Sequence, residues 1–455
     1  MQPNFKKFLS PTKREIGFFR LVLIGVGGTI GPGIFVLLSP GAKIAGSALP
    51  WAFLLGGLLS LGVALIYAEL GSALPVSGAS LNFLFEAFGR GWLPFVTSWL
   101  VILGDISAVA ISALAFGYYV SLLVPVNSVA LAVSVLIIMT LVNIRGVGKT
   151  AWIQSITAAL LLAGLATLTS LLFSRLGVSL ELQNTSGGLI SIMSATAVIY
   201  TVFIGYEDIV SIAGEVKNPD RNIPLALITT VAIITVLFFF VSWVAVNVVP
   251  PEALAQSETP LFLVAEKLGG LGRLIVLPAA ILGAISTLIT TLLVGSRELY
   301  AVSKHNFFRG FLGSLNKWQV PARTVCAVGV VALMLILTDS VEFTAYLANS
   351  VYLLSLLLVI VALFKMKTRR PFLKRPFAIP LFPWLPFVVG GFSLIILMFV
   401  EAKALLATVV WALAGFVFYL ASKIKKERAR LMLMGVLVLI DLTLLSFVVI
   451  ILTGT

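Results

Sequence analysis

The chain has 455 residues, of which 60% are hydrophobic and 11% are charged, and its formal net charge is +13. Its mean hydropathy is +1.12. Apolar runs of about 20 residues recur along almost the whole length, which excludes a large soluble core and predicts a polytopic membrane protein. The single cysteine, Cys326, excludes an intramolecular disulfide, and the single histidine, His305, leaves little for histidine-based catalysis or metal binding. We therefore expect no enzyme.

The apolar runs predict twelve or thirteen membrane spans in an all-α protein. They lie near 18–38, 48–70, 95–123, 128–144, 152–173, 189–212, 225–248, 274–302, 323–338, 343–364, 380–400, 404–422 and 431–452. The predicted organisation is a cytoplasmic tail at 1–17, a core of spans 1–10 at 18–366, spans 11 and 12 at 367–424, and a basic linker with an extra span at 425–455. Asp441 inside that extra span is costly in lipid unless it is paired.

The basic residues are distributed unevenly between the two predicted sides of the membrane. With the N-terminus in the cytoplasm, nearly all of the 31 Lys and Arg residues fall on that side. The exceptions are Lys43, Arg175, Lys267, Arg273 and Lys403. This is the positive-inside pattern, so the basicity indicates topology in the cell membrane rather than nucleic-acid binding. The basic segment from Phe364 to Phe377 helps to fix that topology, with anionic lipid or a regulatory contact as alternatives.

The first apolar run, FFRLVLIGVGGTIGPGIFVLL, concentrates glycines and Pro32 in its middle. Glycine loosens a helix, and proline removes one N–H and clashes with the preceding turn. Freed backbone groups at membrane depth are tolerated only beside protein or a water-filled cavity, and such discontinuous helices build the midplane sites of secondary transporters. The alternative is a packing face, because Gly27 and Gly31 also form a GxxxG pair.

A second irregularity lies in the sixth span, where Gly205 is followed by Tyr206, Glu207 and Asp208. Each carboxylate costs roughly 2.5–3.5 kcal/mol on insertion scales, so at least one is expected to face a cavity or a protein partner. We predict a coupling or substrate role for Glu207; alternatively, it hydrogen-bonds backbone amides at a helix break. Breaks five spans apart predict a 5+5 bundle, in which spans 1–5 and 6–10 are inverted repeats.

Four motifs in order carry a resemblance to a known family. They are GVGGTIGPGIF in span 1, YAELGSALPVSGASLNFLFEAFG from Tyr67, FIGYEDIVSIAGEVKNPDRNIP from Phe203 and GSRELYAVSKHN from Gly295. Together they resemble the amino acid–polyamine–organocation (APC) superfamily. The resemblance implies the leucine-transporter-type fold and secondary transport or exchange of amino acids or related amines by alternating access.

The resemblance also implies a substrate site at the two breaks. The substrate carboxylate would lie on backbone N–H groups from Gly31 to Ile34, and its ammonium on nearby carbonyls, with Phe203 or Tyr206 as an aromatic cover. The implied residues are Thr29, Gly31, Pro32, Gly33, Ile34, Thr201, Val202, Phe203, Ile204, Gly205, Tyr206 and Glu207. A half-helix N-terminus favours an anion and unwound carbonyls favour a cation.

Pro32 departs from the family pattern, because relatives usually place Ser or Thr there. Losing this donor weakens carboxylate binding by about 1.5–3 kcal/mol unless Gly33 and Ile34 compensate. Asp105 in span 3, with the carboxylates of span 6, suits an amine, so a polyamine or cationic amine that needs no carboxylate contact is the alternative substrate. Asp105 can equally tie down a neighbouring helix.

A second departure from the family pattern concerns the residues that would bind the coupling ion. Leu161 occupies the place where some proton-coupled relatives have a lysine in span 5. Gly283, Ser286 and Thr287, with carbonyls of Gly27 and Ile30, resemble a sodium site, and ligation by oxygen alone suits a hard cation. The alternatives are exchange without an ion, protons carried by Glu207, and hydroxyls that only bond their own helix.

The sequence thus predicts a transporter in the lipid bilayer with a small-molecule substrate, no nucleic-acid partner and no cofactor besides sodium or a proton. Monomer and homodimer both stay open. A cation channel is the alternative from a different class, but the chain has no repeated filter motif.

Overall fold

The structure is a computed structural model that describes residues 14–75, 79–89, 91–146, 150–176, 188–303 and 312–422. Every regular element in these ranges is a helix, and the only β-pairing there is an isolated bridge between Ile16 and Val216. The all-α fold class is confirmed. The predicted span at 431–452, the tail before residue 14 and His305 lie outside the described residues.

Both predicted helix breaks are confirmed. The first span consists of α1 (Phe18–Thr29), α2 (Gly33–Val36) and α3 (Leu38–Ala45). The sixth consists of α9 (Gly188–Ile199), the 3-10 turn η3 (Tyr200–Phe203) and α10 (Asp208–Ser211). The first break follows from Pro32, which lies directly before α2, and the second from Gly205, whose φ of +122° is rare for any residue with a side chain.

The other predicted spans correspond to single helices. These are α4 (Leu49–Ala73), α6 (Trp92–Ser121), α7 (Ser128–Arg145), α8 (Thr150–Leu176), α11 (Pro219–Val248), α14 (Gly270–Val302), α15 (Ala322–Ile336), α16 (Val341–Arg369), α17 (Trp384–Leu397) and α18 (Ala402–Ser422). Within the described ranges nine helices are long and apolar enough to cross a membrane, and three shorter apolar helices match the predicted spans at 18–38, 323–338 and 380–400.

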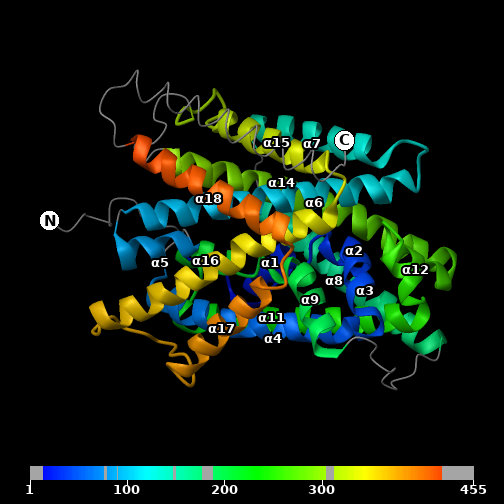
Figure 1. Cartoon of the computed structure of the whole chain (residues 1–455), viewed down its shortest axis with the longest axis horizontal. Coiled ribbons are helices and arrows are strands. Elements are labelled where there is room, and N and C mark those ends of the chain that lie inside the picture. The colour runs from blue at the N-terminus through cyan, green and yellow to red at the C-terminus, as the bar shows by residue number, and fades with distance from the viewer. Residues whose placement is uncertain are drawn as a thin grey trace.

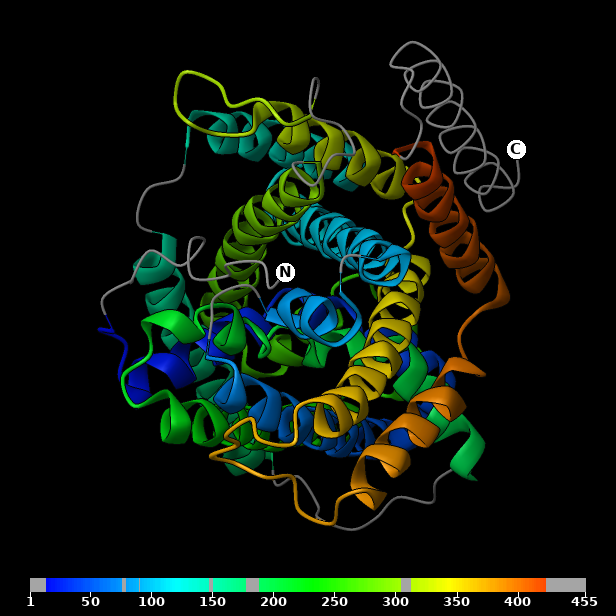
Figure 2. The same ribbon diagram turned by 90° about the vertical axis from the view of Figure 1, so that its left-hand side faces the viewer.

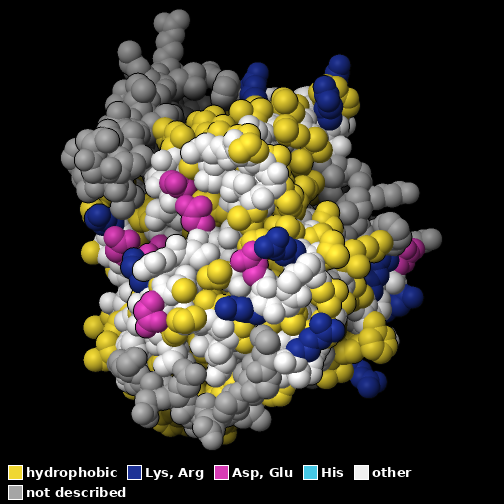
Figure 3. Space-filling view, turned by 90° about the vertical axis from the view of Figure 1, so that its right-hand side faces the viewer, with side chains coloured by type: hydrophobic (Ala, Val, Ile, Leu, Met, Phe, Trp, Pro, Cys, Tyr) yellow, Lys and Arg dark blue, Asp and Glu magenta, His cyan; other side chains and the backbone are white. Residues whose placement is uncertain are grey.

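Short helices that the sequence did not predict connect the spans. They are α5 (Ala79–Phe88), α12 (Pro251–Ala255) and α13 (Pro260–Ala265), with 3-10 turns at Gly46–Ala48, Ala213–Glu215 and Glu266–Leu268. In Figure 1, α5 and α12 lie at opposite ends of the bundle. Figure 3 faces the α12 end, where acidic and basic side chains are scattered among apolar ones.

The helix packing repeats itself with an offset of five spans. α1 contacts α10, α4 contacts α11, α6 contacts α14 and α7 contacts α15. These contacts join span 1 to span 6, span 2 to span 7, span 3 to span 8 and span 4 to span 9, respectively. Other contacts also occur in corresponding pairs. α1 contacts α8 in the first half, and α9 contacts α16 in the second half. In the same way, α8 contacts α14, and α16 contacts α6. Looking along the bundle, Figure 2 shows α6 surrounded by other helices and α18 at the periphery.

Candidate functional site

The two breaks touch each other backbone to backbone at Gly28 and Gly205. A Cβ added to Gly28 would lie 2.6 Å from the carbonyl oxygen of Gly205, and a Cβ on Gly205 would overlap the carbonyl group of Gly28. Real Cβ atoms do not approach backbone so closely, so both positions require glycine for this contact. The glycines of the two motifs therefore place the two unwound segments against each other.

The amides of the first break differ from the predicted carboxylate cradle. The N–H of Gly31 donates to the carbonyl of Thr29 at 2.8 Å, and Pro32 has no N–H. Among the described residues, the N–H groups of Gly33 and Ile34 donate to no protein acceptor. Two of the four residues from Gly31 to Ile34 thus keep a donor that a substrate can use, because the tight turn after α1 occupies the third.

The second break supplies free carbonyls. The carbonyl of Thr201 accepts from the N–H of Ile204 at 3.2 Å. Those of Val202 and Ile204 accept no hydrogen bond from the part of the chain that the structure describes. A Cβ on Gly33 would lie 3.0 Å from Cγ1 of Val202, so the free amides and the free carbonyls come from segments in contact. The arrangement offers donors from one break and acceptors from the other.

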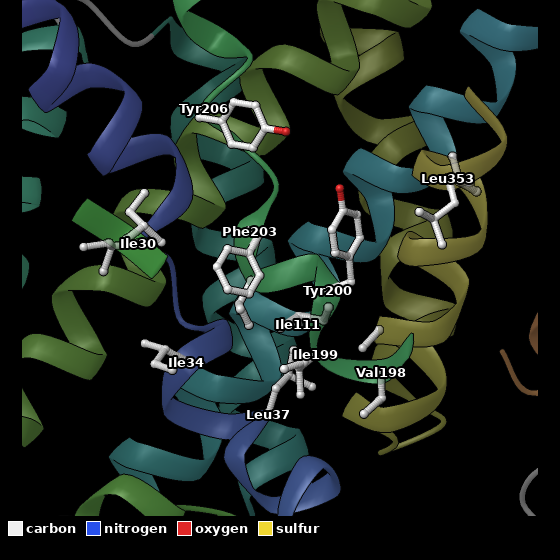
Figure 4. Close-up of a cluster of buried hydrophobic side chains, with 14 of the residues drawn as sticks. Ile30, Ile34, Leu37, Ile111, Val198, Ile199, Tyr200, Phe203, Tyr206 and Leu353 are labelled. Carbon is white, nitrogen blue, oxygen red and sulfur yellow. The ribbon is translucent and has the colours of Figure 1, made fainter. Parts of the chain in front are cut away.

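Apolar and aromatic side chains surround this contact. Figure 4 shows Ile30 and Ile34 on one side, with Tyr200, Phe203 and Tyr206 across from them. The ring of Phe203 is completely buried and packs on Gly56 of α4. The hydroxyl of Tyr206 donates to the carbonyl of Ser60, also on α4, at 3.3 Å. Both predicted aromatic covers are thus anchored on α4, and their contact with substrate stays a prediction.

The carboxylates divide between the break and a neighbouring pair of helices. Oε2 of Glu207 accepts the N–H of Gly205 at 2.9 Å, the backbone contact that was the alternative to a coupling role. Oδ2 of Asp208 lies 3.1 Å from the position of a Cβ on Gly28. Asp105 lies on α6 and contacts Glu298 of α14. Sequence reasoning missed Glu298, although an acidic residue inside an apolar span is a recognisable signal.

The hydroxyl set on α14 lies beside the first break. Oγ1 of Thr287 is 3.2 Å from the position of a Cβ on Gly31, and a Cβ on Gly283 would lie 3.3 Å from Leu161. The hydroxyl of Thr290 bonds its own helix at 3.0 Å, but within the described residues those of Ser286 and Thr287 donate to no carbonyl. These two hydroxyls are therefore available to a ligand, as the predicted sodium site requires.

Two further polar residues hold the half-helices in place and were not predicted. The hydroxyl of Tyr119 on α6 donates to the carbonyl of Phe35 in α2 at 2.9 Å. The amide of Asn349 on α16 donates to the carbonyls of Ala197 and Val198, at 2.9 and 3.0 Å, where α9 ends. A buried Asn in an apolar span is the signal for such a contact, but only the fold shows which helix end it caps.

Comparisons with known proteins identify the family that this chain resembles. A family model described as amino acid permease matches residues 16–422. The branched-chain amino acid permease BcaP of Bacillus subtilis is 29% identical over 90% of this chain and 92% of its own. The methylthioribose transporter of Bacillus subtilis is 26% identical over 89% and 92%. Solute carrier family 7 member 12 of Mus musculus is 27% identical over 84% of each chain.

The matched region contains both helix breaks and the polar groups around them, and the apolar helices make the chain an integral membrane protein. The resemblance inferred from the four motifs is confirmed, and the function is amino acid transport across a membrane. The chain belongs to the amino acid permease family.

Proposed function

We propose that the chain is a secondary transporter or exchanger without enzymatic activity, which carries amino acids by alternating access through the contact between the two breaks. The observation that carries this proposal is the contact of Gly28 with Gly205, which brings free amides of one half-helix beside free carbonyls of another. An amino acid has an anionic and a cationic group on one carbon, so a site with paired donors and acceptors fits it.

The proposed architecture is the 5+5 inverted repeat. The contacts between spans 1 and 6, 2 and 7, 3 and 8, and 4 and 9 support it, because a two-fold axis between two repeats relates each span to the one five positions later. Spans 1, 2, 6 and 7 would then move against spans 3–5 and 8–10. We place the N-terminus in the cytoplasm and the protein in the cell membrane, on the positive-inside pattern.

Branched-chain amino acids are the substrates we propose to test first. The side chains around the contact are apolar, Ile30 and Ile34 among them, and a permease for branched-chain amino acids is among the relatives. An apolar surround favours an aliphatic side chain, with about 0.8 kcal/mol for each buried CH₂ group.

Saturable uptake of radiolabelled valine into proteoliposomes tests this function. We expect uptake in the wild type, competition by unlabelled leucine, and loss of uptake in Gly205→Ala, whose Cβ would overlap Gly28. Gly391→Ala is the matched control, because a Cβ there meets nothing within 4 Å. Competition by a polyamine and not by leucine would favour the amine alternative. An ion current that does not saturate and is unaffected by solutes would indicate a channel.

For the coupling ion we propose sodium at Ser286 and Thr287 with carbonyls of the first break. The free hydroxyls of both residues and the contact of Thr287 with Gly31 support this site. Sodium-driven uptake should fall in Ser286→Ala and Thr287→Ala but not in Thr290→Ala, whose hydroxyl only bonds its own helix. Uptake that ignores a sodium gradient would contradict the assignment.

A further inference from the structure

A pair of carboxylates lies between α6 and α14, with Asp105 buried and Glu298 half-buried. Asp105 is 7% exposed, and its carboxyl group interacts with that of Glu298. Gly295 makes this approach possible, because a Cβ there would lie 3.0 Å from Cβ of Asp105. Glu298 follows Gly295 by three residues and so lies on the same face of α14.

Among the described residues, the pair has unsatisfied oxygen atoms and forms no ion pair with a cation. Oδ2 of Asp105 and Oε2 of Glu298 are buried without a hydrogen-bond partner. The hydroxyl of Tyr352 on α16 donates to Oδ1 of Asp105 at 3.5 Å, a distance too long for a strong bond. The ion pairs formed among the described residues involve other carboxylates.

The other ionisable groups that face the pair add negative charge. Asp208, from α10, interacts electrostatically with both members, and Glu207 interacts with Asp105. Tyr352 is a further titratable neighbour of both carboxylates. Two touching carboxylates away from water cannot both carry charge without a counter-ion, whereas one proton between them makes one group the donor and satisfies both free oxygens. An ammonium group would have to separate the two carboxyls.

We propose that Asp105 and Glu298 form a proton-binding site that holds one shared proton while the core is closed, and that transport requires this proton. One carboxylate takes the proton from water when the site opens to one side, and returns it to water when it opens to the other. No bond to substrate forms or breaks. Asp208 links the site to the sixth span, since its charge faces the pair and it lies against Gly28 of α1.

This site deepens the proposed function and rests on it, and it is separate from the hydroxyl set. Thr287 and Glu298 are about three turns apart on α14, roughly 16 Å along the axis. The pair can therefore bind a proton whether or not sodium occupies the other site, and the test keeps the sodium concentration fixed and equal on both sides.

The test is the pH profile of valine uptake by the full chain in proteoliposomes, with equal pH on both sides. In the wild type, uptake should be highest at low pH and fall about tenfold per pH unit once the proton is lost, as for a single titrating site. Asp105→Asn and Glu298→Gln should each flatten the profile, and Glu252→Gln, an exposed carboxylate on α12, should leave it unchanged. Variant profiles parallel to that of the wild type would overturn the proposal.

Infrared difference spectra of the purified protein keep the proposal testable if a variant does not transport. The wild type should show the carbonyl stretch of a protonated carboxylic acid, and both variants should lose the same band because one proton is shared. A wild type without that band, or a band that persists in both variants, would overturn the proton site. A wild type that takes up no solute at any pH would instead contradict the proposed transport function.

Discussion

Two buried carboxylate regions differ in how their charge is compensated. Glu69 of α4 is fully buried, yet Nζ of Lys367 lies 3.0 Å and Nε of Arg375 3.3 Å from its Oε1, and the N–H of Ile379 donates to its Oε2 at 2.9 Å. The pair of Asp105 and Glu298 has no cation among the described residues. The first region is an internal counter-ion arrangement, whereas the second is the site at which we propose a shared proton.

The basic segment at 364–377 explains the compensated region. Besides the contacts to Glu69, Arg370 pairs with Glu86 of α5, and Lys374 lies 3.7 Å from Asp220 of α11. The segment thus packs on α4, α5 and α11 in addition to any role in topology. The difference teaches that a buried acid in a membrane bundle is structural where the fold brings cations to it, and a candidate for function where it does not.

The largest expected effect comes from Glu69→Gln, which leaves Lys367 and Arg375 without their common carboxylate. Removing one partner of a buried pair should lower the free energy of unfolding by about 3–5 kcal/mol. Denaturant titration of the purified protein in detergent measures this change. A loss below about 1 kcal/mol would show that the contact is not structural.

Gly295→Ala should disrupt the contact between Asp105 and Glu298 through steric overlap alone, without changing any charge. The new Cβ would lie 3.0 Å from Cβ of Asp105, so α6 and α14 must separate, at a cost of about 1–3 kcal/mol. We expect the pH dependence of uptake to weaken as well, because the two carboxyls lose contact. Gly391→Ala is the control for the loss of a glycine in a helix. Unchanged stability and an unchanged pH profile would contradict the close approach.

Glu298→Gln is the same chemical change as Glu69→Gln, with the opposite expectation for stability. Removing an acid that pairs with no cation in the described part of the chain should change the free energy of unfolding by less than about 1 kcal/mol, or increase it, since no positive charge compensates it there. The titration used for Glu69→Gln gives the comparison directly. A loss as large as that at Glu69 would remove the distinction between the two regions.

The smallest effect is expected for an exposed pair. Nζ of Lys43 lies 3.2 Å from Oε2 of Glu342, with side-chain exposures of 63% and 33%. Lys43→Ala should cost less than about 1 kcal/mol because water screens both charges. High salt should reduce even this small difference in unfolding free energy, and a cost comparable to that at Glu69 would mean that burial is not what separates the regions.

The spans and both helix breaks could be predicted from the sequence, because the length of an apolar run, a glycine cluster and Pro32 each determine the structure of their own segment. It could not predict that the N–H of Gly31 is occupied by Thr29, since that depends on the turn after α1. The pairing of Glu298 with Asp105 could not be predicted, because it depends on how α6 and α14 are aligned against each other. The sequence also could not predict which cations pair with Glu69, because they lie about 300 residues away along the chain.

The most direct test of the central claim is substrate protection at the second break. Cys326→Ser removes the only cysteine, and Thr201→Cys then places a single thiol beside the free carbonyls. We predict that valine slows labelling of this thiol by a membrane-permeant maleimide, but not that of Ser191→Cys near the start of α9. Equal labelling with and without any amino acid at Thr201→Cys, in protein that still takes up valine, would contradict a substrate site where the two breaks meet.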